Sequence, residues 1–127
     1  MKIFLDCGSN VGQGYTHFRQ KYGEDYHYIL FEPNPSCYKV LMKQFGMLSN
    51  VDIHEEAVCI EDCIKPFEFL TEYCVGGSLI KNHNSAYNND DKKEILVKCV
   101  DIVKIIENHL LLNNDRRKVF PLLFLLP

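Results

Sequence analysis

Two acids and two glycines near the N-terminus have the residue types and spacing of a ligand-binding site. Asp6, Gly8 and Gly12 form the pattern acid-x-Gly-x-x-x-Gly, and Glu32 lies 20 residues after Gly12. Glycines let the backbone turn sharply and let a ligand approach without a Cβ in the way. An acid at the tip of the next strand can accept hydrogen bonds from both hydroxyls of a ribose. The pattern therefore predicts a ligand that contains a nucleoside.

The glycine spacing argues against a dinucleotide. Started at Gly12 and Gly14, the fingerprint Gly-x-Gly-x-x-Gly meets His17 at its third glycine position. Started at Gly8, it meets Asn10 at its second. The sequence also has no Gly-x-x-x-x-Gly-Lys-Ser/Thr phosphate loop. The spacing present is that of S-adenosylmethionine-dependent methyltransferases, whose cofactor has no pyrophosphate for the loop to wrap. A nucleotide-binding oxidoreductase that uses a nicotinamide cofactor on the same architecture is the alternative that this spacing disfavours.

Four motifs between residues 3 and 108 resemble the FkbM family of methyltransferases. The most distinctive is Phe31-Glu32-Pro33-Asn34-Pro35, which is similar to the family's second-strand ending. The others are the run Asp-Cys-Gly-Ser-Asn-Val-Gly-Gln at 6–13, Glu56-Ala57-Val58, and Val100-Asp101-Ile102.

The resemblance implies a Rossmann-like class I methyltransferase fold that binds S-adenosyl-L-methionine. It implies transfer of a methyl group to a hydroxyl oxygen of a sugar or other small molecule, so that the partner is a small-molecule or glycan acceptor. Asp6, Gly8 and Gly12 would line the methionine end of the cofactor, with Asn10 in the same loop. Glu32 would bind the ribose, Pro33 and Asn34 would shape the loop, and Glu56 and Ala57 would flank the adenine. The resemblance assigns no general base and no metal ligand to this chain.

The C-terminal residues depart from the family. Where its members carry an acidic motif resembling Lys-Ile-Asp-x-Glu-Gly, residues 121–127 read Pro-Leu-Leu-Phe-Leu-Leu-Pro. We therefore expect the methyltransferase fold to be incomplete at its C-terminal end. A catalytically inactive, truncated remnant of such an enzyme is accordingly the second interpretation of the sequence.

The elements that must position these residues alternate between strand and helix. The apolar run Lys2–Cys7 predicts a central parallel strand, buried on both faces. Asn34 and Pro35 have the residue types of a helix start, and Gly23 and Gly46 predict helix ends. The other expected strands are 27–31, 51–54, 57–60, 66–70 and 95–100; the expected helices cover 15–22, 35–45 and, capped by Asp101, 102–110. Residues 82–93 are expected to form an exposed loop, and 119–127 a buried strand or the ragged end of an incomplete domain. Strands that alternate with helices in this way predict an α/β fold with a parallel sheet.

Composition places the chain among soluble globular proteins. A length of 127 residues with 46% hydrophobic and 24% charged residues predicts one domain, residues 1–127. A net charge of −3 gives no reason to expect nucleic acid or an anionic membrane as partner. No apolar run has the length of a signal-peptide core or a membrane span, so we expect a cytoplasmic protein.

The six cysteines are not spaced like a metal finger. Cys59 and Cys63 have no His or Cys partner at such a spacing, and no Cys-x-x-Cys pair occurs. In a reducing compartment we therefore expect free, mostly buried thiols and no metal site.

Overall fold

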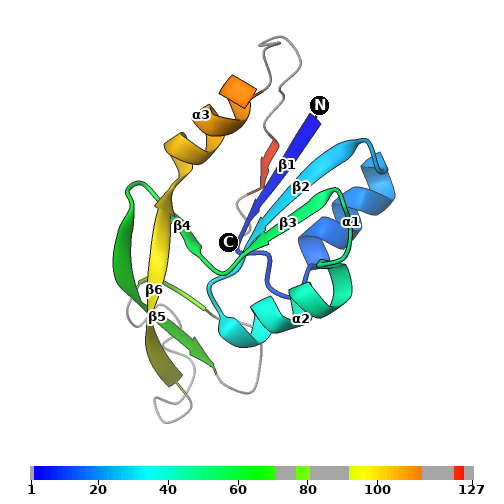
Figure 1. Cartoon of the computed structure of the whole chain (residues 1–127). Coiled ribbons are helices and arrows are strands. Elements are labelled where there is room, and N and C mark those ends of the chain that lie inside the picture. Colours follow the sequence, from blue (N-terminus) through cyan, green and yellow to red (C-terminus); the bar gives the residue numbers. More distant parts are fainter. Residues whose placement is uncertain (1, 71–76, 81–91, 113–121, 125–127) are drawn as a thin grey trace.

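In the computed structural model, the described residues are 2–70, 77–80, 92–112 and 122–124 (Figure 1). Their elements, in chain order, are β1 (Lys2–Cys7), α1 (Gln13–Tyr22), β2 (Tyr26–Phe31), α2 (Pro35–Phe45), β3 (Val51–His54), β4 (Ala57–Cys59), β5 (Cys63–Leu70), β6 (Lys92–Asp101), α3 (Ile102–Leu112) and β7 (Leu122–Phe124). The chain is an α/β protein, and within the described ranges none of its helices is long and apolar enough to cross a membrane.

The first sheet is parallel throughout and has the strand order β3-β2-β1-β7. From β1 the chain first winds through β2 to β3, and it later returns to the other side of β1 with β7. The strand order therefore reverses at β1, which makes the carboxyl end of β1 a topological switch point.

Both faces of this sheet are covered, as the sequence of β1 predicts. On one face, the aromatic side chains of Phe4 and Tyr28 pack with Tyr15 and Phe18 of α1 and with Leu41 of α2. On the other face, the buried residues are Ile3, Leu5, Ile29 and Phe31, and they pack with Val58, Val100, Ile102 and Ile105. Helices α1 and α2 thus lie on one side, and α3 and the second sheet lie on the other (Figure 1).

The second sheet is mixed and has the order β4-β6-β5. Strands β4 and β6 are parallel, whereas β5 and β6 pair antiparallel over eight residues from Cys63↔Cys99 to Leu70↔Lys92. The outward face of this sheet has its own cluster, which contains Ala57, Phe67, Phe69, Val97 and Cys99.

The expected boundaries are confirmed to within three residues. Strands β5 and β6 each begin three residues earlier than expected, at Cys63 and Lys92. The expected loop 82–93 ends too late, because Lys92 and Lys93 already pair in β6; the rest of that loop lies outside the described residues. Strand β4 ends at Cys59, and Ile60 belongs to the turn that follows it. Of the expected segment 119–127, the described part is the short strand β7.

Candidate functional site

Three loops meet at the carboxyl edge of the first sheet because its strands run in register. Cys7 pairs with Phe31, and Phe31 pairs with His54, so β1, β2 and β3 end side by side. The residues that follow these ends are Gly8, Glu32 and Glu55. The motifs that the sequence separates by more than twenty residues therefore share one edge, at the switch point where α/β sheets bind ligands.

The loop after β1 turns through a series of left-handed backbone conformations. The φ angles of Gly8, Asn10 and Gly12 are +98°, +52° and +95°. The N–H groups of Gly8 and Ser9 both donate to the Phe31 carbonyl, at 2.8 and 2.9 Å, which fixes the loop to the end of β2. Glycine adopts a positive φ without the steric cost of other residues, so the backbone conformation accounts for glycine at both positions of the motif.

The two glycines differ in the space around them. A Cβ on Gly12 would lie 2.6 Å from Cε2 of Phe45, so this glycine also makes room for the packing of α2. A Cβ on Gly8 would meet nothing within 4 Å. Gly12 is therefore required by the protein itself, whereas the open space at Gly8 is available to a ligand.

Glu32 joins two of the three loops through its carboxylate. Oε2 accepts a hydrogen bond from the N–H of Asn10 at 2.7 Å, and Oε1 accepts one from the N–H of Asn34 at 2.7 Å. The side chain is buried, and burial raises the pKa of Glu32, whereas the two N–H donors lower it and the charge of Asp6 raises it. Each oxygen keeps a further lone pair with which it can accept from a ligand.

Asp6 is the second buried acid at this edge. It is 1% exposed, and neither carboxylate oxygen has a hydrogen-bond partner among the described residues. Burial raises the pKa of Asp6 to about 6, and the neighbouring Ser9 hydroxyl acts in the opposite direction. A buried carboxylate without donors is costly, so this position favours a ligand that brings a donor or a positive charge.

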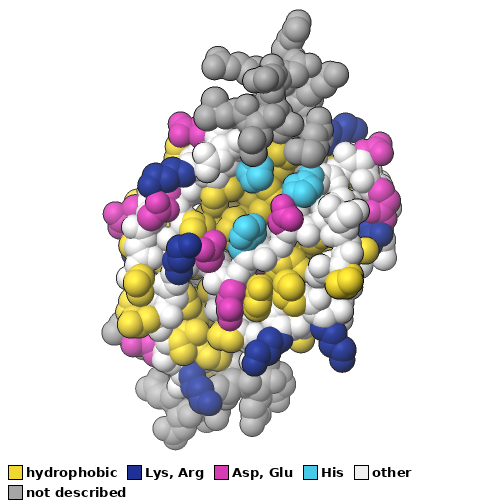
Figure 2. All heavy atoms as spheres, in the orientation of Figure 1, with side chains coloured by type: hydrophobic (Ala, Val, Ile, Leu, Met, Phe, Trp, Pro, Cys, Tyr) yellow, Lys and Arg dark blue, Asp and Glu magenta, His cyan; other side chains and the backbone are white. Residues whose placement is uncertain are grey.

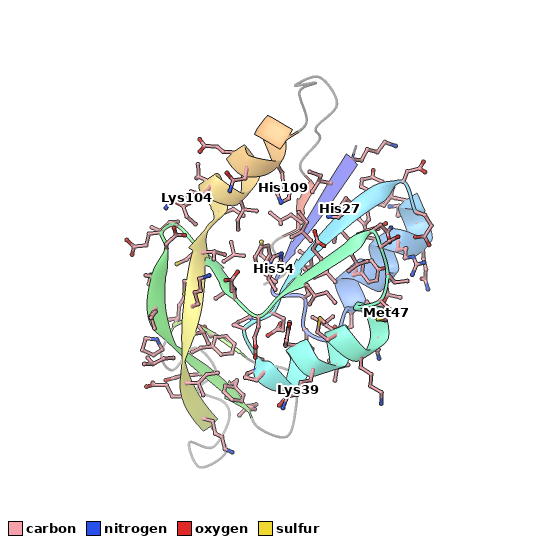
Figure 3. All side chains as sticks on the ribbon, viewed as in Figure 1. His27, Lys39, Met47, His54, Lys104 and His109 are labelled. Atoms are coloured by element: carbon pink, nitrogen blue, oxygen red, sulfur yellow. The ribbon has the colours of Figure 1, made fainter. Side chains whose placement is uncertain are left out.

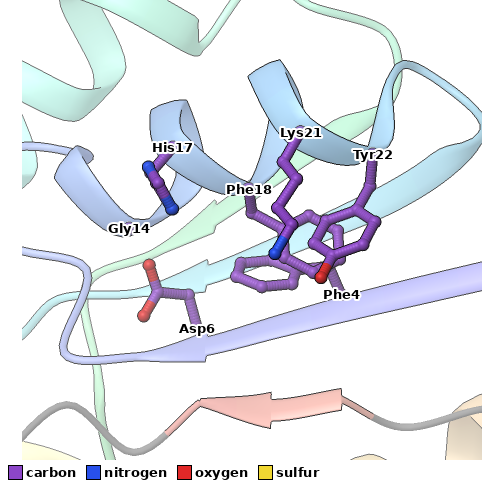
Figure 4. Close-up of a pocket in the computed structure, with 7 residues that line it drawn as sticks. All are labelled: Phe4, Asp6, Gly14, His17, Phe18, Lys21 and Tyr22. Carbon is purple, nitrogen blue, oxygen red and sulfur yellow. The ribbon is translucent and has the colours of Figure 1, made fainter.

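Asp6 lines a cavity of about 220 Å³ between β1 and α1. Figure 4 shows Asp6 and His17 at one end, close to Gly14, and the rings of Phe4, Phe18 and Tyr22 further along α1. Lys21 also lines this space. In the sequence, His17 is notable only because it interrupts the dinucleotide fingerprint, and residue spacing does not predict its place beside Asp6.

The N-termini of the two neighbouring helices differ in their caps. Asn34 caps α2, since its Oδ1 accepts the N–H of Ser36 at 3.0 Å and Pro35 occupies the first helical position, as expected. The cap residue of α1 is Gly12, which offers no side-chain acceptor. The first turn of α1 therefore presents N–H groups without a side-chain cap toward the same edge.

The expected adenine-side residues lie at the same edge but are engaged within the protein. Glu56 Oε1 accepts from Lys98 Nζ at 2.5 Å, and its Oε2 lies 3.9 Å from His54 Nδ1. The Ala57 side chain is buried in the outward cluster of the second sheet, on the opposite side of β4 from Val58. Pro33 and Asn34 are buried beside Glu32, which agrees with a role in shaping the loop.

Three histidines occupy the face of the molecule shown in Figures 2 and 3. Figure 3 places His27 on β2, His54 at the end of β3 and His109 on α3, and Figure 2 shows histidines, acids and apolar side chains mixed on this face. His27 pairs with Asp52 at 2.7 Å, and His54 stacks on Phe31 at 4.7 Å between ring centres. Burial lowers the pKa of His109, and the nearby imidazoles of His27 and His54 lower it further. His27 and His54 therefore have structural roles. A further histidine, His83, lies outside the described residues.

The cysteines depart from the expectation. The five in the described ranges carry free thiols, but only Cys37 and Cys99 are buried. The sulfur atoms of Cys59, Cys63 and Cys99 lie within 4.8 Å of one another, a grouping that the sequence spacing does not predict. The sequence spacing of Cys59 and Cys63 does not reveal this grouping, because the third thiol comes from β6.

Comparisons with protein-family models, with curated proteins and with solved structures find no match for this chain.

Proposed function

We propose that this chain binds S-adenosyl-L-methionine at the carboxyl edge of β1 and β2, as part of a Rossmann-like methyltransferase of the FkbM type. The observation that supports it best is the pairing of a glycine loop, open at Gly8, with two buried acids, Asp6 and Glu32, at a topological switch point. The motif resemblance suggests which cofactor to propose, and the open space beside two buried acids supports this edge as its site.

The charges of the site favour this cofactor over a dinucleotide. S-adenosylmethionine carries a positive ammonium, a positive sulfonium and one carboxylate, so its net charge is positive, whereas a dinucleotide carries a negative pyrophosphate. Burial raises the pKa of both carboxyl groups, and the charge of Asp6 further raises that of Glu32; where they ionise, they create a negative potential in a low-dielectric setting. The loop from Gly8 to Gly14 contains no Lys or Arg that could neutralise a pyrophosphate.

Each residue can be given a part in holding the cofactor. Asp6 would accept hydrogen bonds from the ammonium of the methionyl group, which would supply the donors that its carboxylate lacks. Glu32 would accept from the ribose hydroxyls with the lone pairs that Asn10 and Asn34 leave. Gly8 would allow close approach, and the uncapped first turn of α1 would donate to the methionyl carboxylate.

The bound cofactor would supply an activated methyl group for a nucleophilic acceptor. We propose a hydroxyl oxygen of a sugar or other small molecule as that acceptor, since this is what the resemblance implies. The part of this chain is then to position the cofactor, because alignment of the reacting groups supplies much of the rate in such a transfer.

Calorimetric titration of the full chain tests the binding half of this proposal. We expect S-adenosylmethionine and S-adenosylhomocysteine to bind and NADH to give no heat. A folded sample that binds neither adenosyl compound would refute the proposal, and one that binds only NADH would favour the oxidoreductase interpretation.

A radiolabelled-methyl assay over a panel of sugars and small alcohols tests the transfer half. Incorporation of label into a hydroxyl acceptor is expected for an active enzyme. Cofactor binding without transfer to any member of the panel would favour the catalytically inactive remnant.

A further inference from the structure

A cluster of three thiols lies on the second sheet. Cys59 ends β4, Cys63 begins β5, and Cys99 lies in β6, the strand between them. The turn at residues 60–62 carries the chain from one side of β6 to the other, and Cys63 pairs directly with Cys99 across the strands. As a result, the three sulfur atoms lie within 4.8 Å of one another.

A lysine ammonium lies beside the cluster. Nζ of Lys65 is 3.4 Å from Cys59 Sγ. A positive charge at this distance stabilises a thiolate, which is the form of cysteine that binds a metal.

The spacing of the sulfurs is close to that of a metal–thiolate centre. Metal–sulfur bonds of about 2.3 Å place the sulfurs of a trigonal or tetrahedral site roughly 3.8–4.0 Å apart. Sulfurs within 4.8 Å of one another need at most about 1 Å of adjustment to reach that spacing. Cys59 and Cys63 are only half-buried, which leaves them free to adjust and gives an ion a path to Cys99.

We propose that Cys59, Cys63 and Cys99 form a binding site for a thiophilic metal ion. An all-sulfur ligand set selects soft ions and disfavours Mg²⁺ and Ca²⁺, which require oxygen ligands. Cu⁺ fits three thiolates in trigonal coordination, and Zn²⁺ fits them with its fourth position open. Lys65 offsets part of the negative charge that three thiolates leave around either ion. This inference stands on the second sheet alone and does not depend on the proposed cofactor site.

Competition titrations of the reduced full chain with Zn²⁺ and with Cu⁺, each against a chromogenic chelator, test the proposal. We expect one equivalent of one of these ions to bind, with release of about two to three protons, because thiols must lose their protons to bind a metal. Proton release is measured by calorimetry in two buffers that differ in ionisation enthalpy. The bound ion should also raise the unfolding temperature, since it binds only the folded cluster.

Cys59→Ser and Cys63→Ser are the informative variants because both side chains are half-buried. Each should weaken metal binding by at least about tenfold, or ~1.4 kcal/mol. Cys7→Ser, which removes a half-buried thiol from β1, is the matched control and should bind as the wild type does. Circular dichroism of the metal-free variants establishes that they fold.

Two results would overturn the proposal. One is a reduced, folded wild-type chain that binds neither ion. The other is binding that Cys59→Ser and Cys63→Ser leave unchanged. A Cys63–Cys99 disulfide in the oxidised chain, together with no metal binding by the reduced chain, would identify the cluster as a redox pair instead.

Discussion

The backbone N–H of Asn10 donates to Glu32 Oε2 at 2.7 Å, and this bond fixes the loop after β1 to the loop after β2. Asn10 has a φ of +52°, a left-handed conformation that asparagine adopts more readily than other non-glycine residues. The residue type and the hydrogen bond therefore support the same loop conformation. Glu32 has a structural role before any ligand binds, and a ribose would share a carboxylate that already has two partners.

Replacing Glu32 by Ala should destabilise the protein. The substitution leaves the N–H groups of Asn10 and Asn34 unpaired, so we expect a loss of about 2–4 kcal/mol in the free energy of unfolding. Urea denaturation measures this loss. Glu55→Ala, an exposed acid at the same edge, is the control and should change stability by less than about 0.5 kcal/mol. Equal stability of the two variants would show that Glu32 does not hold the loops together.

The buried Asp6 should make the protein less stable as the pH rises. Its pKa is about 6 in the folded chain and 3.8 when exposed, so between these values the folded state holds a proton that the unfolded state has lost. The free energy of unfolding should therefore fall by about 3 kcal/mol as the pH rises through this window.

Asp6→Asn isolates this contribution because it removes the charge and keeps the shape. At neutral pH the variant should be more stable than the wild type by up to about 3 kcal/mol, with the difference vanishing below about pH 4. It should at the same time bind S-adenosylmethionine more weakly, if Asp6 accepts from the ammonium. A stability difference that does not vary with pH would contradict the assignment of the shift to Asp6.

A comparison of Gly8 with Gly23 distinguishes the effect of backbone strain from that of ligand contact, because both glycines are exposed and have open space around them. Gly8 and Gly23 have φ angles of +98° and +82°, and a Cβ on either would meet nothing within 4 Å. Gly8→Ala should lose about 1–2 kcal/mol of stability. Gly23 has φ +82° and ψ −163°, a conformation that glycine alone adopts readily, so Gly23→Ala should lose about 1–3 kcal/mol. Only Gly8→Ala should weaken S-adenosylmethionine binding, by about tenfold or more. Calorimetry checks this, and equal affinities of the two variants would place the cofactor away from Gly8.

Local signals in the sequence predict the first sheet and its helices well. Asn34 and Pro35 mark the start of α2 because a cap and a fixed φ act within a few residues, and Gly23 ends α1 with a positive φ. The alternation of these elements also predicts that Asp6 and Glu32 share one edge. That inference is general, since the carboxyl ends of parallel strands must meet.

Relationships between distant strands could not be predicted in this way. Cys99 joins Cys59 and Cys63 only because β6 lies between β4 and β5, and strand order is not encoded in residue spacing. The engagement of Glu56 by Lys98 follows from the same pairing. Likewise, the sequence predicts an acid at position 32 but not that its oxygens bind the N–H groups of Asn10 and Asn34.

Gly12 should be intolerant of substitution for a reason separable from ligand binding. In Gly12→Ala the positive φ of +95° adds strain, and the new Cβ would lie 2.6 Å from Phe45 Cε2. Together these effects should cost about 2–4 kcal/mol. Phe45→Leu shortens the obstructing side chain but leaves the φ strain in place.

The double variant should therefore recover part of the loss and not all of it. In a double-mutant cycle, the loss for Gly12→Ala with Phe45→Leu should be smaller than the sum of the single losses by at least about 0.5 kcal/mol. Chemical denaturation of the four proteins gives this coupling. Strict additivity would mean that the backbone conformation alone requires glycine, and that the contact with Phe45 relaxes without cost.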